Sequence, residues 1–386
     1  MGLLYLMGAS SDPNPRSLFS ANEPGVVFDT QEALNRGWLY QDVNGQTPVT
    51  APGDPIGLQL DTSRGGLDAL GSDLVANGTF DADASWTKGA NWTIGSGVAT
   101  KTGGAANNLT QTISSTAGLW YRCTATVTRT AGTLTISLGT SGTSFAVSAS
   151  GTYTFFLLAG SSTQTLTFAG DSSFAGTVDA VTARLVPGTH RYQSTSGSRP
   201  TLQTVSGKYA IQYDGVDDSF VTASINFSGT DKMTVMSAVR KLSDAADAAA
   251  IELGVGGANG NFGIGAPGSS TVTKFQYYSR GTSSSVPFTA SATYNAPVTV
   301  ALTAFSDIAN DVAVLRLNGL QVDSRTTDQG SGNYLNAALN FGSRSGGLQR
   351  FNGYEFCTII RGATTSDGVI RDFERNLLAR RAGISF

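Results

Sequence analysis

Carboxylates have the most obvious potential for chemistry in this chain, yet its glutamates are few and scattered. The sequence contains five of them, no two closer than nine residues: Glu23, Glu32, Glu252, Glu355 and Glu374. Hydrolysis of a glycosidic bond needs two carboxylates held about 5–5.5 Å or about 6.5–9.5 Å apart. Alternate residues of a strand share one face, but no segment carries glutamates at such a spacing. We therefore expect no catalytic pair of glutamates; chemistry by aspartates alone stays open, although no pattern points to it.

The densest group of acidic side chains is Asp214, Asp217 and Asp218, which lie in the run Asp-Gly-Val-Asp-Asp with Gly215 and Val216. Oxygen ligands at such short spacing suit a hard cation such as calcium. The same residues are typical of a tight turn, in which aspartate accepts backbone hydrogen bonds and glycine takes a positive φ. Calcium takes about 6–8 oxygen ligands, which is more than this run supplies. The turn is therefore the favoured interpretation.

His190 is the one histidine of the sequence. A multi-histidine metal site is therefore excluded, and a Ser-His-Asp triad has no support, so we expect a structural role for His190. The two cysteines, Cys123 and Cys357, lie far apart among strand-like neighbours. We expect them to be buried free thiols rather than a disulfide.

Two pairs of adjacent aromatic residues are candidates for contacts with sugars, Trp120–Tyr121 and Tyr277–Tyr278. An aromatic ring offers the apolar face of a sugar a large contact area at little entropic cost. Large aromatic side chains in sandwiches are nevertheless more often core residues. Because adjacent residues of a strand face opposite sides, at most one member of each pair should be buried. We expect the other member to be a ligand contact.

The elements that must position these residues are predicted to be short strands. The 386 residues include 47 glycines, abundant threonine and serine, and only 14% charged residues, which is typical of turns that alternate with strands. Asn318-Gly319 is a strong hairpin signal. Near the C-terminus, apolar residues recur at helical spacing: Val369, Ile370, Phe373, Leu377 and Leu378. The sequence therefore predicts an all-β protein closed by one helix, which Gly383 ends.

Charge and hydropathy exclude several classes of partner. The net charge is −3 and no basic stripe is present, so we expect no nucleic-acid binding. No stretch reaches the roughly 18–20 apolar residues of a membrane span, so we expect a soluble chain without membrane insertion. Residues 1–11 lack the basic leader and the long apolar region of a signal peptide. We expect them to form a strand or an arm that packs on a neighbour, in a protein that is not exported by the ordinary secretory route.

Three regions differ in their patterns. Residues 1–66 are rich in turn residues and cannot bury a core alone. Residues 67–187 carry strand-like segments every 8–12 positions or so, which is typical of a jelly roll or sandwich. Residues 188–386 repeat this pattern on a larger scale and end in the predicted helix. We expect residues 1–66 to pack with residues 188–386.

The last region resembles the concanavalin A-like (laminin G-like) lectin domains that are common in bacteriophage tail and fibre proteins. The segments that carry this resemblance are YAIQYDGVDDSFV (209–221), PVTVALTAFSD and VLRLNGLQVDS (within 297–324), and FNGYEFCTIIRGATTSDGVIRDFERNLLARRAGISF (351–386). The resemblance implies a concanavalin A-like β-sandwich with a C-terminal helix and an association with a virion.

The middle region resembles a carbohydrate-binding jelly roll, from LVANGTFDADASW (74–86) to GTVDAVTARLV (176–186). In related phage proteins a Leu-Asp-x-Ser stretch runs almost directly into a His-x-x-Gln-x-Thr stretch. Here these halves are LDTS (60–63) and HRYQSTSGSRP (190–200), separated by the whole middle region. We infer that a jelly roll is inserted into the lectin-like unit, which is tolerated where the termini of the inserted unit lie close together.

The jelly-roll resemblance also implies a metal site. Asp81 and Asp179 match positions where that family often places a structural calcium ion, although Asp81 stands where glutamate is commoner. No cofactor is otherwise expected.

The sequence supports one leading hypothesis of function and three alternatives. The leading one is a virion structural protein of a tail fibre, tail tip or other appendage, with lectin-like modules that recognise a host-surface polysaccharide. Its partners would be other virion proteins and further copies of the same chain, assembled in the host cytoplasm. The alternatives are a purely architectural head or tail decoration protein, a polysaccharide-degrading enzyme, and a bacterial adhesin, which would need an export signal.

Overall fold

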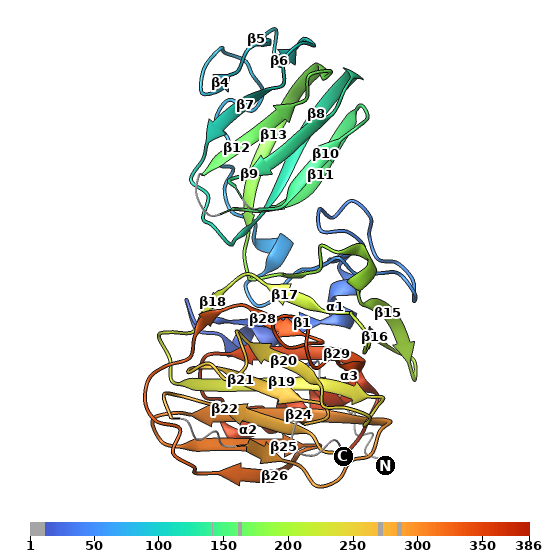
Figure 1. The fold of residues 1–386 in the computed structure, drawn as a ribbon, viewed down its shortest axis with the longest axis vertical. Helices are drawn as coiled ribbons and strands as arrows, with labels where there is room; N and C mark the ends of the chain where they lie inside the picture. Colours follow the sequence, from blue (N-terminus) through green and yellow to red (C-terminus); the bar gives the residue numbers. More distant parts are fainter. Residues whose placement is uncertain (1–11, 141, 161–163, 269–272, 284–287) are drawn as a thin grey trace, which may run out of the picture.

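The computed structural model describes residues 12–140, 142–160, 164–268, 273–283 and 288–386. A smaller and a larger β-sandwich lie one above the other along the long axis (Figure 1). Most regular elements are strands, and the predicted all-β class is confirmed. The strand or arm expected at residues 1–11 lies outside the described residues. No helix in the described part of the chain is long and apolar enough to cross a membrane.

The first sheet of the larger sandwich has the strand order β15–β16–β29–β19–β24–β25–β26, and β1 pairs with β29 beside this path. Its strands are β1 (Gly25–Asp29), β15 (Thr201–Val205), β16 (Lys208–Asp214), β19 (Lys232–Lys241), β24 (Val298–Asp307), β25 (Val312–Leu317), β26 (Leu320–Arg325) and β29 (Asn352–Arg361). The strand β1 therefore lies in one sheet with strands from the C-terminal half of the chain.

The second sheet faces the viewer in Figure 1 and has the order β2–β3–β14–β17–β28–β20–β21–β22–β23. Its strands are β2 (Leu39–Tyr40), β3 (Leu58–Gln59), β14 (Arg191–Tyr192), β17 (Phe220–Thr222), β20 (Ala249–Leu253), β21 (Phe262–Gly265), β22 (Gln276–Ser279), β23 (Phe288–Ala290) and β28 (Leu339–Phe341). A separate pair consists of β18 (Ile225–Asn226) and β27 (Asn336–Ala337). Neighbouring strands in this sheet thus come from both sides of the smaller sandwich in sequence.

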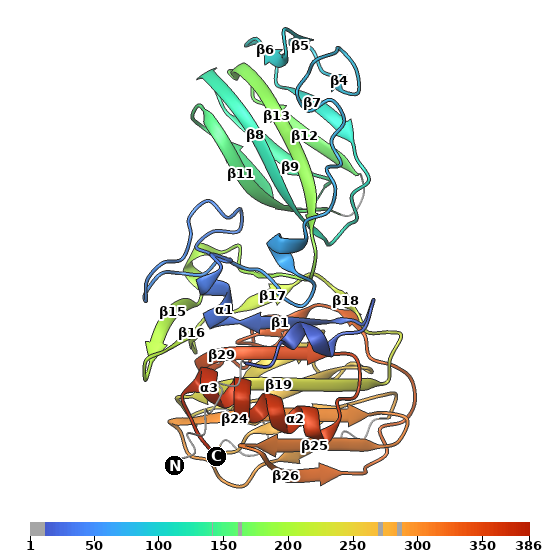
Figure 2. The ribbon, with the colours of Figure 1, turned by 180° about the vertical axis from the view of Figure 1, so that it is seen from behind.

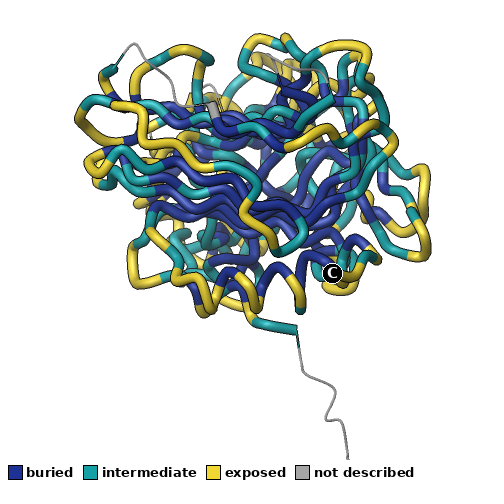
Figure 3. The backbone as a smooth tube through the Cα atoms, turned by 90° about the horizontal axis from the view of Figure 1, so that it is seen from below, coloured by how far each residue is buried: buried dark blue, intermediate teal, exposed yellow. Residues whose placement is uncertain are grey.

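An apolar core of buried residues lies between the two sheets. Figure 3 shows buried strands in the interior and exposed residues in the surrounding loops. An arginine lies at the centre of this core. The Arg191 guanidinium donates to both carboxylate oxygens of Glu355, at 2.9 and 2.8 Å. It also lies over the rings of Phe28, Phe220 and Phe341. A buried charge is tolerated only with such a partner, and the aromatic faces add further attraction to the cation.

The C-terminus forms one helix in three continuous segments: α2 (Asp367–Phe373), the π-helical η4 (Glu374–Leu378) and α3 (Ala379–Ala382). Figure 2 shows this helix on the outer face of the first sheet. Phe373 and Leu377 belong to an apolar cluster with Met236 of that sheet. Arg316 of β25 donates to both carboxylate oxygens of Glu374 at 2.9 Å. The predicted helix is confirmed, and it adds a third layer to the sandwich.

The smaller sandwich consists of two five-stranded sheets in the described residues, with the orders β10–β9–β12–β7–β4 and β11–β8–β13–β6–β5. Its strands are β4 (Thr87–Lys88), β5 (Trp92–Gly95), β6 (Val98–Lys101), β7 (Asn107–Thr112), β8 (Trp120–Ala131), β9 (Leu134–Leu138), β10 (Ser144–Val147), β11 (Gly151–Leu158), β12 (Thr165–Gly170) and β13 (Ala175–Val186). A separate apolar cluster fills the space between these sheets.

The described part of the chain has four further short helical segments: η1 (Pro15–Leu18), α1 (Thr30–Asn35), η2 (Gly66–Ala69) and η3 (Ser196–Ser198). Asp29 caps α1, because its carboxylate accepts a hydrogen bond from the Glu32 backbone N–H at 3.1 Å. The same carboxylate accepts from Arg381 of α3 at 2.8 Å. Asp29 therefore ties the N-terminal segment to the C-terminal helix.

The segments that flank the smaller sandwich pair with each other in the larger one. In the register of β3 and β14, Gln59 lies opposite Arg191 and Leu58 opposite Tyr192. The chain leaves the larger sandwich after β3 and returns to it at β14 (Figure 1). We interpret the smaller sandwich as a unit inserted at this point.

A loop of the larger sandwich holds the edge strand β11 of the smaller one. The Phe156 backbone N–H donates to the Asn44 carbonyl at 2.9 Å, and Asn44 Nδ2 donates to the Phe156 carbonyl at 3.0 Å. The Phe156 ring lies 5.2 Å from the Tyr40 ring, measured between centroids. Phe156 and Trp120 belong to the apolar core of the larger sandwich. Hydrogen bonds and a shared core therefore join the two sandwiches.

Candidate functional site

A hollow on the outer face of the second sheet brings several polar groups and an aromatic ring together. The strand register places Glu252 of β20 opposite Gly263 of β21, and Gly263 opposite Tyr278 of β22. A Cβ atom on Gly263 would lie 2.5 Å from the Tyr278 ring. The absence of a side chain at Gly263 therefore allows Tyr278 to lie across β21 and reach Glu252.

Glu252 is the centre of this arrangement and is only 1% exposed. Its Oε1 accepts hydrogen bonds from the Tyr278 hydroxyl at 2.5 Å and from Arg344 Nε at 2.9 Å, and its Oε2 accepts from the Ser345 backbone N–H at 3.2 Å. Burial raises the pKa of Tyr278, and the Glu252 charge raises it further. The tyrosine therefore stays a neutral hydrogen-bond donor at physiological pH.

Amide groups and a second carboxylate complete the lining of the hollow, which includes Asp247, Gln276 and Gln349. Gln349 Nε2 donates to the Asp247 carboxylate. The cavity measures about 30 Å³, which is room for about one water molecule. A larger ligand must therefore lie over the hollow and place single groups in it.

The expectation that at most one member of the Trp120–Tyr121 pair is buried is wrong. Trp120 is 0% exposed and Tyr121 is 2% exposed. Tyr121 lies in the core of the smaller sandwich, where its hydroxyl accepts from the Thr116 backbone N–H at 2.8 Å. Trp120 faces the larger sandwich, with its ring 5.3 Å from that of Tyr192. Docking of the two sandwiches buries the second side of the strand, so neither residue can stack on a sugar.

The Tyr277–Tyr278 pair shows the expected alternation. Tyr277 is fully buried, and its hydroxyl lies 2.5 Å from Ser306 Oγ, which lies 2.5 Å from the Tyr334 hydroxyl. Tyr277 is thus part of a polar network inside the sandwich and cannot contact a ligand. Tyr278 is half-buried on the outer face and stays a predicted ligand contact.

Asp81 lies in the loop before β4, and Asp179 lies in β13 beside a shift in its pairing register with β8. A hydrogen bond of 2.9 Å from the Val181 backbone N–H to the Gly78 carbonyl joins the two segments. Within the described residues, neither aspartate belongs to a group of three ionisable side chains that could share a metal ion. A calcium ion at Asp81 and Asp179 stays a prediction from the resemblance.

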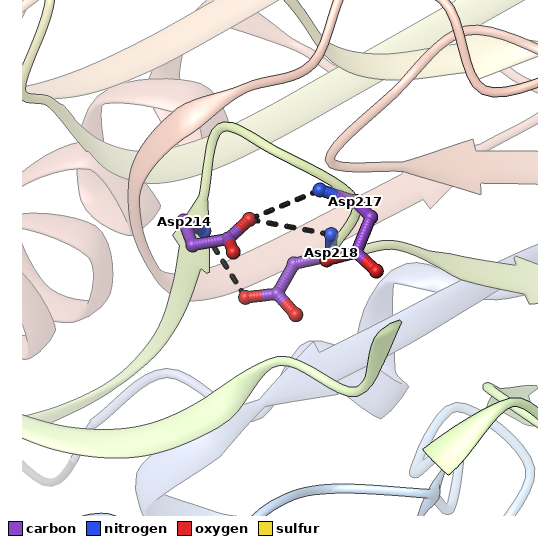
Figure 4. Close-up of side chains that lie close together, drawn as sticks. All are labelled: Asp214, Asp217 and Asp218. Carbon is purple, nitrogen blue, oxygen red and sulfur yellow. Dashed lines mark hydrogen bonds between the residues drawn. The ribbon is translucent and has the colours of Figure 1, made fainter. Parts of the chain in front are cut away.

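Asp214, Asp217 and Asp218 form the predicted turn (Figure 4). The Asp214 carboxylate accepts from the backbone N–H groups of Val216 at 2.8 Å and Asp217 at 3.2 Å. Gly215 takes a φ of +78°. One carboxylate oxygen from each aspartate lies within 4.8 Å of the others. Burial, together with the charge of Asp214, raises the pKa of Asp218 to about 6.

The histidine and the cysteines have the structural positions expected of them. His190 is fully buried, and its Nδ1 accepts from the Asp61 backbone N–H at 2.9 Å. Burial lowers the pKa of His190 to about 3, so its ring is neutral. Cys123 and Cys357 are buried free thiols.

Sequence reasoning gives no signal that Glu252 and Arg344 meet, because 92 residues separate them. One local signal could have marked this face. In the run Phe-Gly-Ile-Gly of β21, Gly263 and Gly265 alternate with buried apolar residues, so the outer face of the strand carries no side chains. A glycine inside a strand often marks the close approach of another group.

Comparison with known proteins does not assign the chain to a family. No protein-family model matches the sequence, and no curated protein matches it. Among solved structures, the receptor-binding domain of botulinum neurotoxin D is similar at 11% identity and a TM-score of 0.35, over 46% of this chain and 48% of that chain. The serotype D ligand-binding domain in complex with N-acetylneuraminic acid gives 11% and 0.35, over 46% of each chain. The neurotoxin DC binding domain in complex with rat synaptotagmin II gives 11% and 0.33, also over 46% of each chain. The similar part spans less than half of each toxin chain, and we draw no conclusion about ligands from a likeness this low.

Proposed function

We propose that this chain is a structural protein of a bacteriophage virion whose larger sandwich binds a host-surface glycan over the hollow at Tyr278 and Glu252. One observation carries the glycan assignment. The Tyr278 ring, the Glu252 carboxylate, the Arg344 guanidinium and side-chain amides lie together on the outer face of the sheet, where Gly263 has no side chain. Sugar hydroxyls pair with such polar groups, and sugar C–H faces pack on such rings. This contact requires no metal ion or other cofactor.

The virion assignment rests on the resemblance of residues 209–221 and 351–386 to phage tail and fibre domains. On this proposal the protein resides in the virion, where it contacts other virion proteins and further copies of itself. Assembly takes place in the host cytoplasm.

We assign the smaller sandwich the role of a rigid spacer. Its tryptophans are in the core, since Trp86 is 7% exposed and Trp92 is 4% exposed, and neither offers a free ring to a sugar. Threonines line the outer face of β8 and its neighbours, and the Oγ1 atoms of Thr124 and Thr182 lie 2.6 Å apart. This face, which is rich in threonine and also carries Arg122 and Arg184, favours the second candidate function, an architectural decoration of the particle without a glycan ligand.

Binding to immobilised bacterial capsules and lipopolysaccharides tests the proposal. We expect the wild-type protein to bind at least one of them and the Tyr278→Ala variant to lose that binding. Tyr153→Ala is the matched control, because Tyr153 is a half-buried tyrosine of the smaller sandwich. If the wild type binds none of these polysaccharides, the architectural function replaces the glycan-binding one.

The enzyme alternative is tested by incubation with the same polysaccharides and measurement of new reducing ends. We expect no turnover, because both oxygens of Glu252 already accept hydrogen bonds from the protein. Sustained release of reducing ends would overturn the proposal of a binding protein.

A further inference from the structure

A second hollow adjoins the one at Tyr278 and Glu252. It measures about 160 Å³, and both polar and small side chains line it. Its lining includes Gly215, Ser243, Ala248, Arg350 and Asn352. Ala248 lines both hollows, while Gln349 lines the first and its neighbour Arg350 lines the second. The two hollows are therefore adjacent.

Backbone hydrogen bonds fix the walls that the two hollows share. The Leu242 backbone N–H donates to the Asn352 carbonyl at 2.9 Å, and the Ala249 N–H donates to the Gln349 carbonyl at 2.9 Å. The segments 242–249 and 349–352 therefore run side by side along both hollows. A ligand would meet preformed walls and would not have to order them, which favours affinity.

Arg350 supplies the main polar group of the second hollow. Its Nη1 donates to the Asp217 carbonyl at 2.9 Å, which fixes the side chain against the Asp214–Asp218 turn. Gly215 of this turn packs against Asn352, because a Cβ atom there would lie 2.8 Å from that side chain. The guanidinium, the Asn352 amide and the Ser243 hydroxyl all offer donors to sugar oxygens.

Two exposed aliphatic residues are sequence neighbours of residues that line the hollows. Val216 is 73% exposed and follows Gly215 of the second hollow, and Leu348 is 66% exposed and precedes Gln349 of the first. A chain of sugars presents apolar C–H faces as well as hydroxyls, so it would contact these side chains at the margins of the polar hollows.

We propose that the two hollows form one groove, which binds an internal stretch of an extended polysaccharide rather than a single terminal sugar. This inference rests on the proposed glycan-binding function. One sugar lies over Tyr278 and Glu252, and a sugar further along the same chain accepts hydrogen bonds from the Arg350 guanidinium and both donates to and accepts from the Asn352 amide.

The test is the dependence of affinity on glycan length, measured by calorimetry. The probes are size-fractionated fragments, prepared by partial acid hydrolysis of a capsule or O-chain that the wild type binds. We expect the affinity of the wild type to rise from single sugars to longer fragments and then to level off. The Arg350→Ala variant should bind the shortest fragments like the wild type and the long fragments roughly tenfold more weakly, the cost of a lost charge-assisted hydrogen bond. Arg325→Ala is the matched control, since Arg325 is an exposed arginine on the edge strand β26.

The outcomes separate this inference from the proposed function. If single sugars bind the wild type as tightly as long fragments, or if Arg350→Ala equals the wild type at every length, the groove is wrong while glycan binding at Tyr278 stands. If Arg350→Ala is folded by circular dichroism but loses short and long fragments alike, Arg350 belongs to the first sugar's site and the extended groove is again wrong. If no capsule or O-chain binds at all, the proposed function fails and the groove fails with it.

Discussion

The backbone N–H of Asp61 lies 2.9 Å from Nδ1 of His190, although 129 residues separate the two in sequence. The Asp61 carboxylate accepts in turn from the backbone N–H groups of Val27 and Thr189, both at 2.9 Å. These contacts join the segment by which the chain leaves the larger sandwich to the segment by which it returns from the smaller one. The histidine thus serves as a buried hydrogen-bond acceptor at the junction.

The neutral state of His190 makes stability depend on pH. Its pKa is lowered from 6.5 to about 3 by burial, so below pH 6.5 the unfolded chain takes up a proton that the folded chain does not. The free energy of unfolding should therefore fall as pH decreases from about 6.5 toward about 3, by about 1.4 kcal/mol per pH unit from this residue. Urea unfolding of the wild type and His190→Gln at several pH values measures this slope.

The comparison with His190→Gln isolates the histidine from other titrating groups. Burial raises the pKa values of Asp61 and Asp218. As pH falls, these two groups therefore bind protons at a higher pH in the folded chain than in the unfolded chain, which stabilises the folded state. Both are present in the two proteins, and their effect cancels in the difference. Equal pH slopes for the two proteins would contradict a neutral buried His190.

Trp120 should hold the two sandwiches together. Truncation of a buried tryptophan costs about 3–5 kcal/mol, and in Trp120→Ala we expect this loss at the junction. Hydrogen exchange at the Phe156 amide, which donates to the Asn44 carbonyl across the junction, should accelerate. In Trp92→Ala, where the ring belongs only to the core of the smaller sandwich, that amide should keep more protection than in Trp120→Ala. The reverse order would show that Trp120 does not couple the units.

Alanine variants of two glycines distinguish the effect of a steric clash at the junction from the effect of backbone strain. Gly45 and Gly53 both have positive φ, +71° and +95°, but a Cβ on Gly45 would lie 2.4 Å from the Phe156 ring, whereas nothing lies within 4 Å of one on Gly53. Both alanine variants carry the strain of a positive φ, about 1 kcal/mol. Thermal unfolding should show a clearly larger loss for Gly45→Ala. Equal losses of thermal stability in the two variants would mean that the loop around Gly45 does not pack closely against β11.

Gly263 should matter for glycan binding more than for folding. An alanine there pushes the Tyr278 ring away from Glu252, because its Cβ would lie 2.5 Å from the ring. We expect roughly tenfold weaker binding to the polysaccharide that the wild type binds. Gly95→Ala is the control, since Gly95 is a strand glycine with nothing within 4 Å of a Cβ. Unchanged binding by a folded Gly263→Ala would show that the position of Tyr278 is unimportant.

Lys101 is a buried ammonium group held by carbonyl oxygens rather than by a carboxylate. Its Nζ donates to Asp171 O at 3.2 Å and to Thr102 O and Phe174 O at 3.4 Å. Lys101→Met leaves these acceptors without that donor, which should cost about 1–3 kcal/mol. Lys88→Met, at a lysine paired with Asp83 near the surface, should change stability by less than about 1 kcal/mol. Calorimetry of the two variants checks this difference, and a Lys101→Met protein as stable as the wild type would contradict it.

Local signals in the sequence predict much of the fold. Asn318 and Gly319, with φ of +51° and +78°, form the predicted two-residue hairpin between β25 and β26. The Asn-Gly dipeptide predicts this hairpin, and the helical spacing of apolar residues before Gly383 predicts the C-terminal helix. Both signals depend only on residues close together in sequence. Such short-range preferences suffice to predict elements of this kind.

The candidate site could not be predicted in the same way. The burial of both Trp120 and Tyr121 depends on the docking of a second sandwich, which strand alternation does not contain. Tyr278 is correctly placed on an outer face by alternation, but its partner Glu252 is brought to it by strand pairing, and Arg344 by a distant loop. Contacts between remote segments follow from the topology, which the local pattern leaves undetermined.

A structure of the protein bound to a polysaccharide that it retains tests the central claim most directly. We expect density for sugar over β20, β21 and β22, in contact with Tyr278 and within hydrogen-bond distance of the groups around Glu252. Density located instead on the smaller sandwich, or at a site that leaves Tyr278 untouched, would contradict the account.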